Sequence, residues 1–324
     1  MTSAPVELTA GEAGRRAAYL NEVLPLLYPE PCATSLPRST STHEDLPVHR
    51  EFVVLPDVAR ARLLAPAGDT RVTVGAVRRY SEPQSLTSRL KRRAVVAAFR
   101  TGTDGLLLRD RVRIHAPEGA DHIERFLHGL LGHQFELSVH IGPARANRKP
   151  VIQLLDDQGR TVAFVKLGVN DLTRTLVRGE AQALLDLADV GFRQLRVPTV
   201  LATGQWHGHE VLASSALPVE QPRVPLDRAR LVGAMREVAG VVGLHRQPLA
   251  ESPYWSGLRG RLAALTDSND GRTLAAAGHE LVSHIGEYRL DFGAWHGDWT
   301  PWNMAAVTDA LLVWDWERFT VGVP

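Results

Sequence analysis

The sequence predicts an α+β fold, and three observations support this prediction. Short apolar runs of strand length, separated by turn residues, occur between residues 136 and 213. One amphipathic helical pattern interrupts these runs at about residues 173–187, and a largely helical stretch follows at about residues 226–290. Antiparallel strands interrupted by one helix and followed by helices are typical of α+β proteins, in which the two kinds of element are segregated.

The strands of this predicted sheet are short, and two of them flank a clear turn. The segment 156–160 is a turn cluster with glycine where a positive φ would be needed, so strands 151–155 and 161–167 are expected to form a hairpin. The helix from about Thr173 to Leu187 follows, and two more strands come after it. The five predicted strands are Glu136–Ile141, Val151–Leu155, Thr161–Leu167, Val197–Thr203 and His209–Ala213.

Residues 1–134 are expected to form an N-terminal extension or cap with mixed α/β content. Its role cannot be assigned from the sequence. A Pro, Ser and Thr-rich loop runs through Leu46. The expected elements are helices Ala10–Leu27, Gln84–Arg100 and Asp121–Gly132, and short strands Glu51–Leu55 and Ala61–Leu64.

The segment from Arg71 to Arg113 is rich in arginine and lysine, with Glu82, Asp104 and Asp110 as its acids. A basic helix suggests a phosphate-rich partner, whereas a solvated face whose arginine stems cover apolar surface is the alternative. We favour the solvated face, because the formal net charge of the whole chain is only +1. A nucleic-acid partner is therefore not expected.

Composition bounds the class of protein. A chain of 324 residues can bury a large core and most naturally holds two domains or lobes. A single cysteine, Cys32, excludes an internal disulfide framework and fits a reducing compartment. No apolar run is long enough to span a bilayer, and the N-terminus lacks the pattern of a signal peptide. We therefore expect a cytoplasmic protein without a membrane partner.

The most informative stretch lies near the end of the chain and reads His296-Gly297-Asp298-Trp-Thr-Pro-Trp-Asn303, followed by Asp315-Trp-Glu317. Asp298 can orient a substrate hydroxyl, while Asn303 and Asp315 offer hard oxygen ligands to magnesium. The apolar residues between Asn303 and Asp315 predict a β-hairpin that brings these two residues close together. Turn chemistry alone is the alternative for each aspartate separately, but a turn does not require the ordered set.

These residues resemble the signature of the aminoglycoside phosphotransferase and choline kinase-like superfamily, here HGDWTPWN and VWDWE. The resemblance implies a bilobal protein-kinase-like fold, with an antiparallel-sheet N-lobe and hinge at 135–218 and a mainly helical C-lobe at 219–324. It also implies transfer of the γ-phosphoryl group of ATP, with magnesium, to a hydroxyl of a small molecule such as an aminoglycoside, sugar or amino alcohol. Asp298 and His296 would be the catalytic residues, with His296 bracing the loop.

Lys166 and Glu180 are the candidate pair at the nucleotide. Lys166 lies in a strand with apolar residues on both sides, and Glu180 falls inside the apolar stripe of the next helix, so each needs a partner. The resemblance implies that Lys166 binds the α and β phosphates and that Glu180 orients it. The alternative is a strand-end lysine in solvent and a helix acid paired with Arg178.

Other nucleotide contacts are expected in two segments. The turn at 141–150 has a single glycine, so Arg145, Asn147 and Lys149 are expected to supply side-chain donors there, with a plain basic hairpin as the alternative. Where the resemblance places the hinge, Ser214, Ser215 and Ala216 are small enough to allow close approach of an adenine.

One feature favours another interpretation. The chain ends nine residues after Asp315, where kinases of this superfamily continue with more helices, so the C-lobe is expected to be truncated. A catalytically impaired nucleotide-binding or interaction module is therefore the alternative function. A metal-dependent hydrolase built on His296 lacks a second histidine at usable spacing, and no zinc-ligand spacing surrounds His207, His209 or His245.

Overall fold

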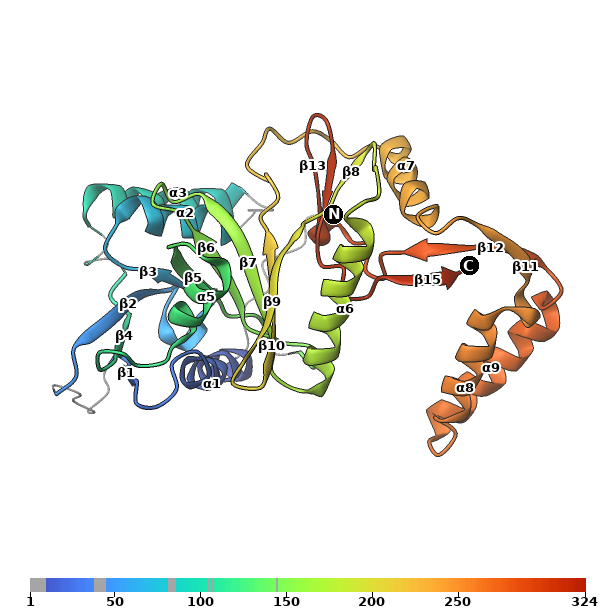
Figure 1. The fold of residues 1–324 in the computed structure, drawn as a ribbon, viewed down its shortest axis with the longest axis horizontal. Coiled ribbons are helices and arrows are strands. Elements are labelled where there is room, and N and C mark those ends of the chain that lie inside the picture. The colour runs from blue at the N-terminus through green and yellow to red at the C-terminus, as the bar shows by residue number, and fades with distance from the viewer. Residues whose placement is uncertain (1–9, 38–44, 81–85, 104, 106–107, 144) are drawn as a thin grey trace. The chain divides into compact units, whose positions relative to one another are not determined.

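The computed structural model describes residues 10–37, 45–80, 86–103, 105, 108–143 and 145–324, and it divides into two compact units (Figure 1). The first unit comprises Met1–Arg178 and Val200–Ala216, and the second comprises Gly179–Thr199 and Leu217–Pro324. Helix α6 (Asp171–Leu187) begins in the first unit and ends in the second. The content is mixed α+β with a large antiparallel sheet, as the sequence predicts.

The first unit is built on one sheet, which has nine strands within the described residues, in the order β1-β4-β2-β3-β5-β6-β7-β10-β9. Every neighbouring pair in it is antiparallel. Its strands are β1 (Ala33–Ser35), β2 (Val48–Leu55), β3 (Leu63–Pro66), β4 (Arg111–His115), β5 (Glu136–His140), β6 (Val151–Leu155), β7 (Thr161–Gly168), β9 (Val200–Trp206) and β10 (His209–Ser215).

Helices cover both faces of this sheet (Figure 1). Phe52 and Val54 of β2 join α1 (Ala10–Leu27) and α5 (Ile123–Leu131) in one buried cluster. Val53 and Leu55 point the other way and pack with α2 (Thr70–Tyr80) and α3 (Leu86–Thr101). Alternate side chains of a strand face opposite sides of a sheet, so an uninterrupted apolar strand must be covered on both sides. A short 3-10 helix, η1 (Val58–Arg60), connects β2 and β3.

The second unit contains two small sheets. Strands β13 (Met304–Ala306) and β14 (Leu311–Val313) form a hairpin, and β8 (Leu195–Arg196) pairs with β14 in parallel. Strand β12 (Arg289–Trp295) lies between β11 (His245–Pro248) and β15 (Thr320–Val323). The other elements are α7 (Arg228–Ala239), η2 (Leu249–Glu251), α8 (Pro253–Ala263), α9 (Asn269–Ile285) and η3 (Pro301–Asn303).

The predicted boundary at residue 134 falls between α5 and β5, and strands from both sides of it belong to the same sheet. Residues before and after the boundary also share one core, since Phe52, Ile123 and Leu154 belong to a single buried cluster. The part of residues 1–134 that is described is therefore packed as an integral portion of the first unit. The kinase-like roles assigned to the three predicted segments stay predictions.

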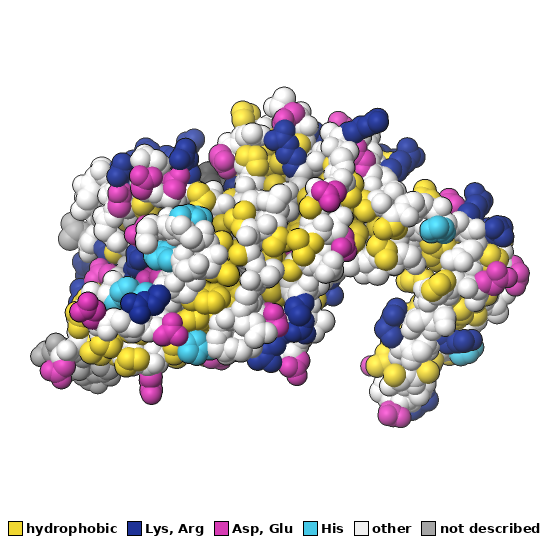
Figure 2. All heavy atoms as spheres, in the orientation of Figure 1, with side chains coloured by type: hydrophobic (Ala, Val, Ile, Leu, Met, Phe, Trp, Pro, Cys, Tyr) yellow, Lys and Arg dark blue, Asp and Glu magenta, His cyan; other side chains and the backbone are white. Residues whose placement is uncertain are grey.

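Charge is distributed as the composition leads one to expect. On the face drawn in Figure 2, basic and acidic side chains are interspersed. The side chains of Arg89, Lys91 and Arg92, part of the basic segment, lie outside the described set. Among the basic residues that are described, Arg113 donates to Glu51 at 2.7 Å and Arg71 to Asp69 at 2.9 Å.

Candidate functional site

The turn after β12 positions the first group of predicted site residues. Gly297 has φ +83°, and a Cβ atom there would lie 2.3 Å from the carbonyl oxygen of Arg318, so the turn requires glycine. The buried imidazole of His296 accepts the Asp298 N–H at Nδ1 (3.2 Å) and donates from Nε2 to the Trp314 carbonyl (3.1 Å). These two bonds fix a neutral tautomer and suit a bracing residue better than an acid or base.

Asp298 and Asn303 are in direct contact. The Asn303 Nδ2 donates to Asp298 Oδ2 at 3.0 Å and to the Asp298 backbone carbonyl at 3.1 Å. Because the amide nitrogen faces Asp298, the amide oxygen of Asn303 is the atom left to ligate a cation. Asn303 is buried and Asp298 is half-buried, so the carboxylate is held in place at the surface.

The hairpin predicted between Asn303 and Asp315 is present, with Met304 paired to Val313 and Ala306 to Leu311. The Trp314 N–H donates to the Asn303 carbonyl at 3.0 Å, which closes the base of the hairpin. Asp315 then adopts φ +70°, a left-handed conformation that is uncommon for residues other than glycine, asparagine and aspartate. Such a backbone is often found where a side chain is aimed at a ligand.

Three carboxylates lie close together at the base of this hairpin. The ligand oxygens of Glu180, Asp315 and Glu317 all lie within 4.8 Å of one another. Glu180 is 2% exposed and Glu317 8% exposed, so two of these carboxyl groups are buried. Carboxylates at this separation repel, and a bound cation relieves the repulsion. An all-oxygen set suits hard ions such as magnesium, manganese or calcium.

This grouping adds to the sequence prediction. Asp315 was expected as a metal ligand with Asn303, and Glu180 was expected beside Lys166. The fold brings Glu180 of α6 next to Asp315 and Glu317, which are more than 130 positions away in the sequence. The Asp-Trp-Glu spacing was the only sequence signal for Glu317, and nothing in the local sequence pointed from Glu180 to the hairpin.

The remaining predicted residues belong to the first unit. Lys166 lies in β7, opposite Leu212 of β10 and Val151 of β6, and is half-buried. Its own face of the strand carries half-buried Val162 and Phe164, while the opposite face is in the core. Lys166 and Glu180 fall in different compact units, so their pairing stays a prediction.

The two other predicted nucleotide segments have distinct local structures. Arg145 is exposed and Asn147 half-buried in a turn where the Arg148 N–H donates to the Arg145 carbonyl at 3.1 Å. Ser214 is buried at the end of β10. The Ala216 N–H donates to the Val162 carbonyl at 3.1 Å, so an adenine contact in this segment would need another backbone group.

Comparison with solved structures gives a partial likeness. No family model matches the chain, and no curated protein matches it. Among solved structures, the spectinomycin phosphotransferase APH(9)-Ia, crystallised in complex with ADP and spectinomycin, is similar at 15% identity and a TM-score of 0.38. The match covers 61% of this chain and 69% of that one. A likeness of this size does not establish a family. In the described part of the chain, no helix is both long and apolar enough to cross a membrane.

Proposed function

We propose that the protein is a phosphotransferase that moves the γ-phosphoryl group of ATP, with magnesium, to a hydroxyl of a small molecule of the aminoglycoside, sugar or amino-alcohol type. The observation that carries the proposal is the arrangement around the β13–β14 hairpin. Asp298 is hydrogen-bonded to Asn303, which directly precedes β13, and Asp315, which stands with Glu180 and Glu317, follows β14, so both groups lie at the base of the hairpin. The order and spacing of these residues match the superfamily signature that the sequence resembles.

Each residue then has a role that follows from its position. Asp298 accepts or orients the acceptor hydroxyl, because its Oδ2 is fixed by Asn303 while its side chain keeps contact with solvent. Asp315 and the Asn303 amide oxygen hold the cation, and Glu180 lies close enough to Asp315 to share it. When bound, magnesium would neutralise charge on the phosphate oxygens and orient them. Lys166 is assigned to the phosphates from its place in the sequence.

Turnover and binding, measured separately on the full chain, test this proposal. ATP with magnesium is offered together with a panel of aminoglycosides, sugars, choline and nucleosides. We expect phosphorylation of at least one class. The variant Asp298→Asn should lose about 10²–10⁴-fold in kcat and retain nucleotide binding, because a positioned proton acceptor contributes about that much.

Asp315→Asn separates the metal role from the acceptor role, and Asp309→Asn is its matched control. Asp309 lies in the turn of the same hairpin but is ion-paired with Arg196. We expect Asp315→Asn to lose magnesium-dependent nucleotide binding and Asp309→Asn to behave as wild type. The proposal would be overturned if the affinity for ATP did not depend on magnesium, or if wild type and Asp298→Asn had equal turnover.

A further inference from the structure

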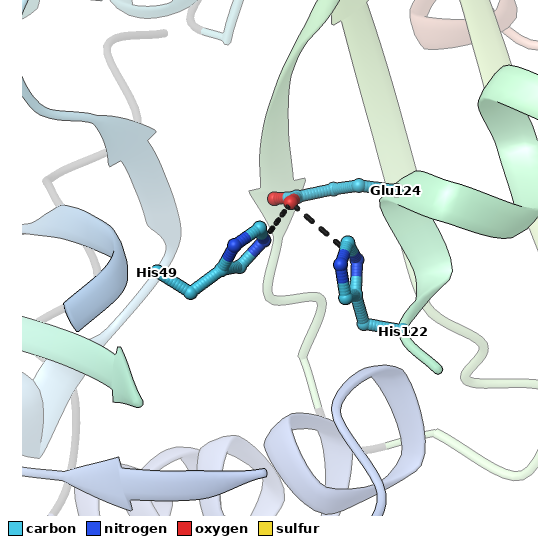
Figure 3. Close-up of side chains that lie close together, drawn as sticks. All are labelled: His49, His122 and Glu124. Atoms are coloured by element: carbon cyan, nitrogen blue, oxygen red, sulfur yellow. Dashed lines mark hydrogen bonds and ion pairs between the residues drawn. The ribbon is translucent and has the colours of Figure 1, made fainter. Parts of the chain in front are cut away.

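A second cluster of potential ligands lies in the first unit, apart from every residue assigned above. The ligand atoms of His49, His122 and Glu124 lie within 4.8 Å of one another. His49 is at the start of β2, His122 is the residue before α5, and Glu124 is in the first turn of that helix. Figure 3 shows both imidazoles directed at the same carboxylate.

We propose that His49, His122 and Glu124 bind a zinc ion. Two imidazoles and one carboxylate form a ligand set that zinc uses where a fourth position stays open to water. Magnesium, in contrast, prefers oxygen ligands, so this cluster and the carboxylate cluster of the second unit differ in the metal they suit. The proposal does not depend on the phosphotransferase assignment.

The distances are compatible with this ion. Two ligands of one tetrahedral zinc, each about 2.0–2.1 Å from the metal, are about 3.3 Å apart. The Oε2 atom of Glu124 is 3.6 Å from Nδ1 of His122 and 2.5 Å from Nε2 of His49. The imidazole of His49 would therefore have to retreat by less than 1 Å, giving up its direct hydrogen bond to the carboxylate.

The Nδ1 atom of His122 offers a lone pair to a cation. This atom accepts the Arg125 N–H at 3.3 Å, so the nitrogen carries a lone pair rather than a proton. The same nitrogen lies 3.6 Å from Oε2 of Glu124, so a zinc ion bound between the two atoms would take this lone pair in place of the Arg125 N–H.

Two hydrogen-bond donors fix the orientation of the Glu124 carboxylate. Arg50 Nε at 3.0 Å and the Tyr28 hydroxyl at 2.9 Å both donate to Oε1 of Glu124, which leaves Oε2 to face the histidines. Such outer contacts orient the ligands of metal sites. Arg50 also pairs with Glu136, so the three charged groups together carry a net −1. The positive charge of Arg50 therefore does not exclude a divalent ion.

The three proposed ligands differ in their exposure to solvent. The side chain of His49 is 29% exposed, that of His122 12% and that of Glu124 3%. An ion can enter beside His49, and water can occupy the fourth position there. Bound zinc would tie the start of β2 to the N-terminus of α5, and we therefore expect it to stabilise the first unit.

The test is zinc binding by the full chain, measured by competition with a chromophoric chelator and by thermal unfolding. We expect one zinc per chain and a higher Tm with zinc. His49→Ala should weaken affinity by at least about 100-fold, because removing an outer contact alone costs about 10–100-fold. His122→Asn should do the same while keeping a good helix cap, which guards against loss of folding. The matched control is His133→Ala, because His133 is exposed and its described contacts are a hydrogen bond to the Leu131 carbonyl and an edge-on ring contact with Phe135.

Cobalt gives an independent readout, because a tetrahedral site with nitrogen and oxygen ligands produces visible absorption bands that His49→Ala and His122→Asn should abolish. Magnesium should neither compete nor raise Tm through this site. Absence of stoichiometric zinc in the wild type, or equal affinity in the wild type and both ligand variants, would overturn the proposal.

Discussion

At the scale of single residues, His140 shows how burial sets a pH dependence. It lies in β5, its Nε2 contacts Oε1 of Gln153 at 3.1 Å, and its ring meets that of Phe164 edge-on. Burial lowers the pKa of His140 to about 4, the hydrogen bond to Gln153 opposes this, and the charge of Arg79 lowers it further. The folded protein therefore holds this imidazole neutral, while the unfolded chain protonates it at its ordinary pKa of 6.5.

We predict that stability falls as the pH is lowered from about 6.5 to about 4, because only the unfolded state takes up the proton of His140 in this range. The stabilisation is fully present above pH 6.5, and its loss levels off below pH 4. The contribution is about 1–3 kcal/mol, since the residue keeps some solvent contact. Denaturant unfolding at pH 7.5 and pH 4.5 should show a smaller difference for His140→Gln than for wild type. An undiminished difference in His140→Gln, or an equal reduction in the exposed control His133→Gln, would contradict the prediction.

Asp315 supports a second residue-scale prediction, which concerns its backbone. Its φ of +70° is tolerated by asparagine but costs alanine about 1 kcal/mol or more. Asp315→Asn and Asp315→Ala both remove the negative charge beside Glu180 and Glu317. The change in electrostatic repulsion is therefore the same in the two variants and does not affect the difference in stability between them. Asp315→Asn should therefore be the more stable by about 1 kcal/mol in denaturant unfolding. The pair Asp309→Asn and Asp309→Ala in the same hairpin should differ by less, and a reversed order at 315 would show that φ is not the deciding factor.

At the scale of elements, the packing of α2 on the β6–β7 turn depends on two glycines. A Cβ atom at Gly75 would lie 2.0 Å from the carbonyl oxygen of Gly159, and one at Gly159 would lie 2.3 Å from that of Arg71. The helix backbone therefore touches the turn backbone directly. Since both neighbours are main chain, neither can move without displacing α2 from the sheet.

We predict that Gly75→Ala destabilises the protein by about 1–3 kcal/mol, the usual range for overpacking. Gly14→Ala is its matched control, because Gly14 also lies within a helix but its added Cβ would meet nothing within 4 Å. That change should stabilise the protein by about 0.5–1 kcal/mol through helix propensity. Urea unfolding measures the free energy of unfolding of both variants. Equal effects of the two substitutions would show that the close approach of the two backbones does not limit the size of the residue at position 75.

Helices and strands with a clear hydrophobic periodicity could be predicted from the sequence. Elements whose apolar residues alternate with charged ones could not. The predicted helix Ala10–Leu27 and strand Val151–Leu155 have the observed bounds, because apolar spacing alone decides them. Strand β4 was missed, although Arg111, Arg113 and His115 alternate with Val112 and Ile114. Its arginines belong to the basic segment 71–113, and that charge hides the strand pattern; in the fold, Arg113 is paired with Glu51 of β2.

The candidate sites divide in the same way. The hairpin and the contact between Asp298 and Asn303 arise from residues close in sequence, so spacing was sufficient to predict them. The cluster of His49, His122 and Glu124 joins residues more than 70 positions apart. Only the strand order and the approach of α5 to β2 bring them together. The spacing of His122 and Glu124 in the sequence does not indicate that His49 is their neighbour.

At the scale of the whole molecule, the first unit is discontinuous in sequence. Its sheet needs β9 and β10, which follow only after the chain has passed through residues 179–199 of the second unit. Strand β10 pairs with β7 along six residues. Trp206, Val211 and Ala213 also belong to the main buried cluster, and Trp206 Nε1 donates to the Leu26 carbonyl of α1 at 3.0 Å.

We predict that a fragment of residues 1–216 folds and that a fragment of residues 1–199 does not. The shorter fragment leaves the edge of β7 unpaired and removes three core side chains, of which Trp206 alone contributes about 3–5 kcal/mol, against a total stability of about 5–15 kcal/mol. An exposed strand edge also invites aggregation. Cooperative thermal unfolding and resistance to limited proteolysis distinguish the two fragments. If residues 1–199 unfolded cooperatively at a temperature close to that of residues 1–216, the β9–β10 hairpin would be an accessory to the sheet rather than a part that its folding requires.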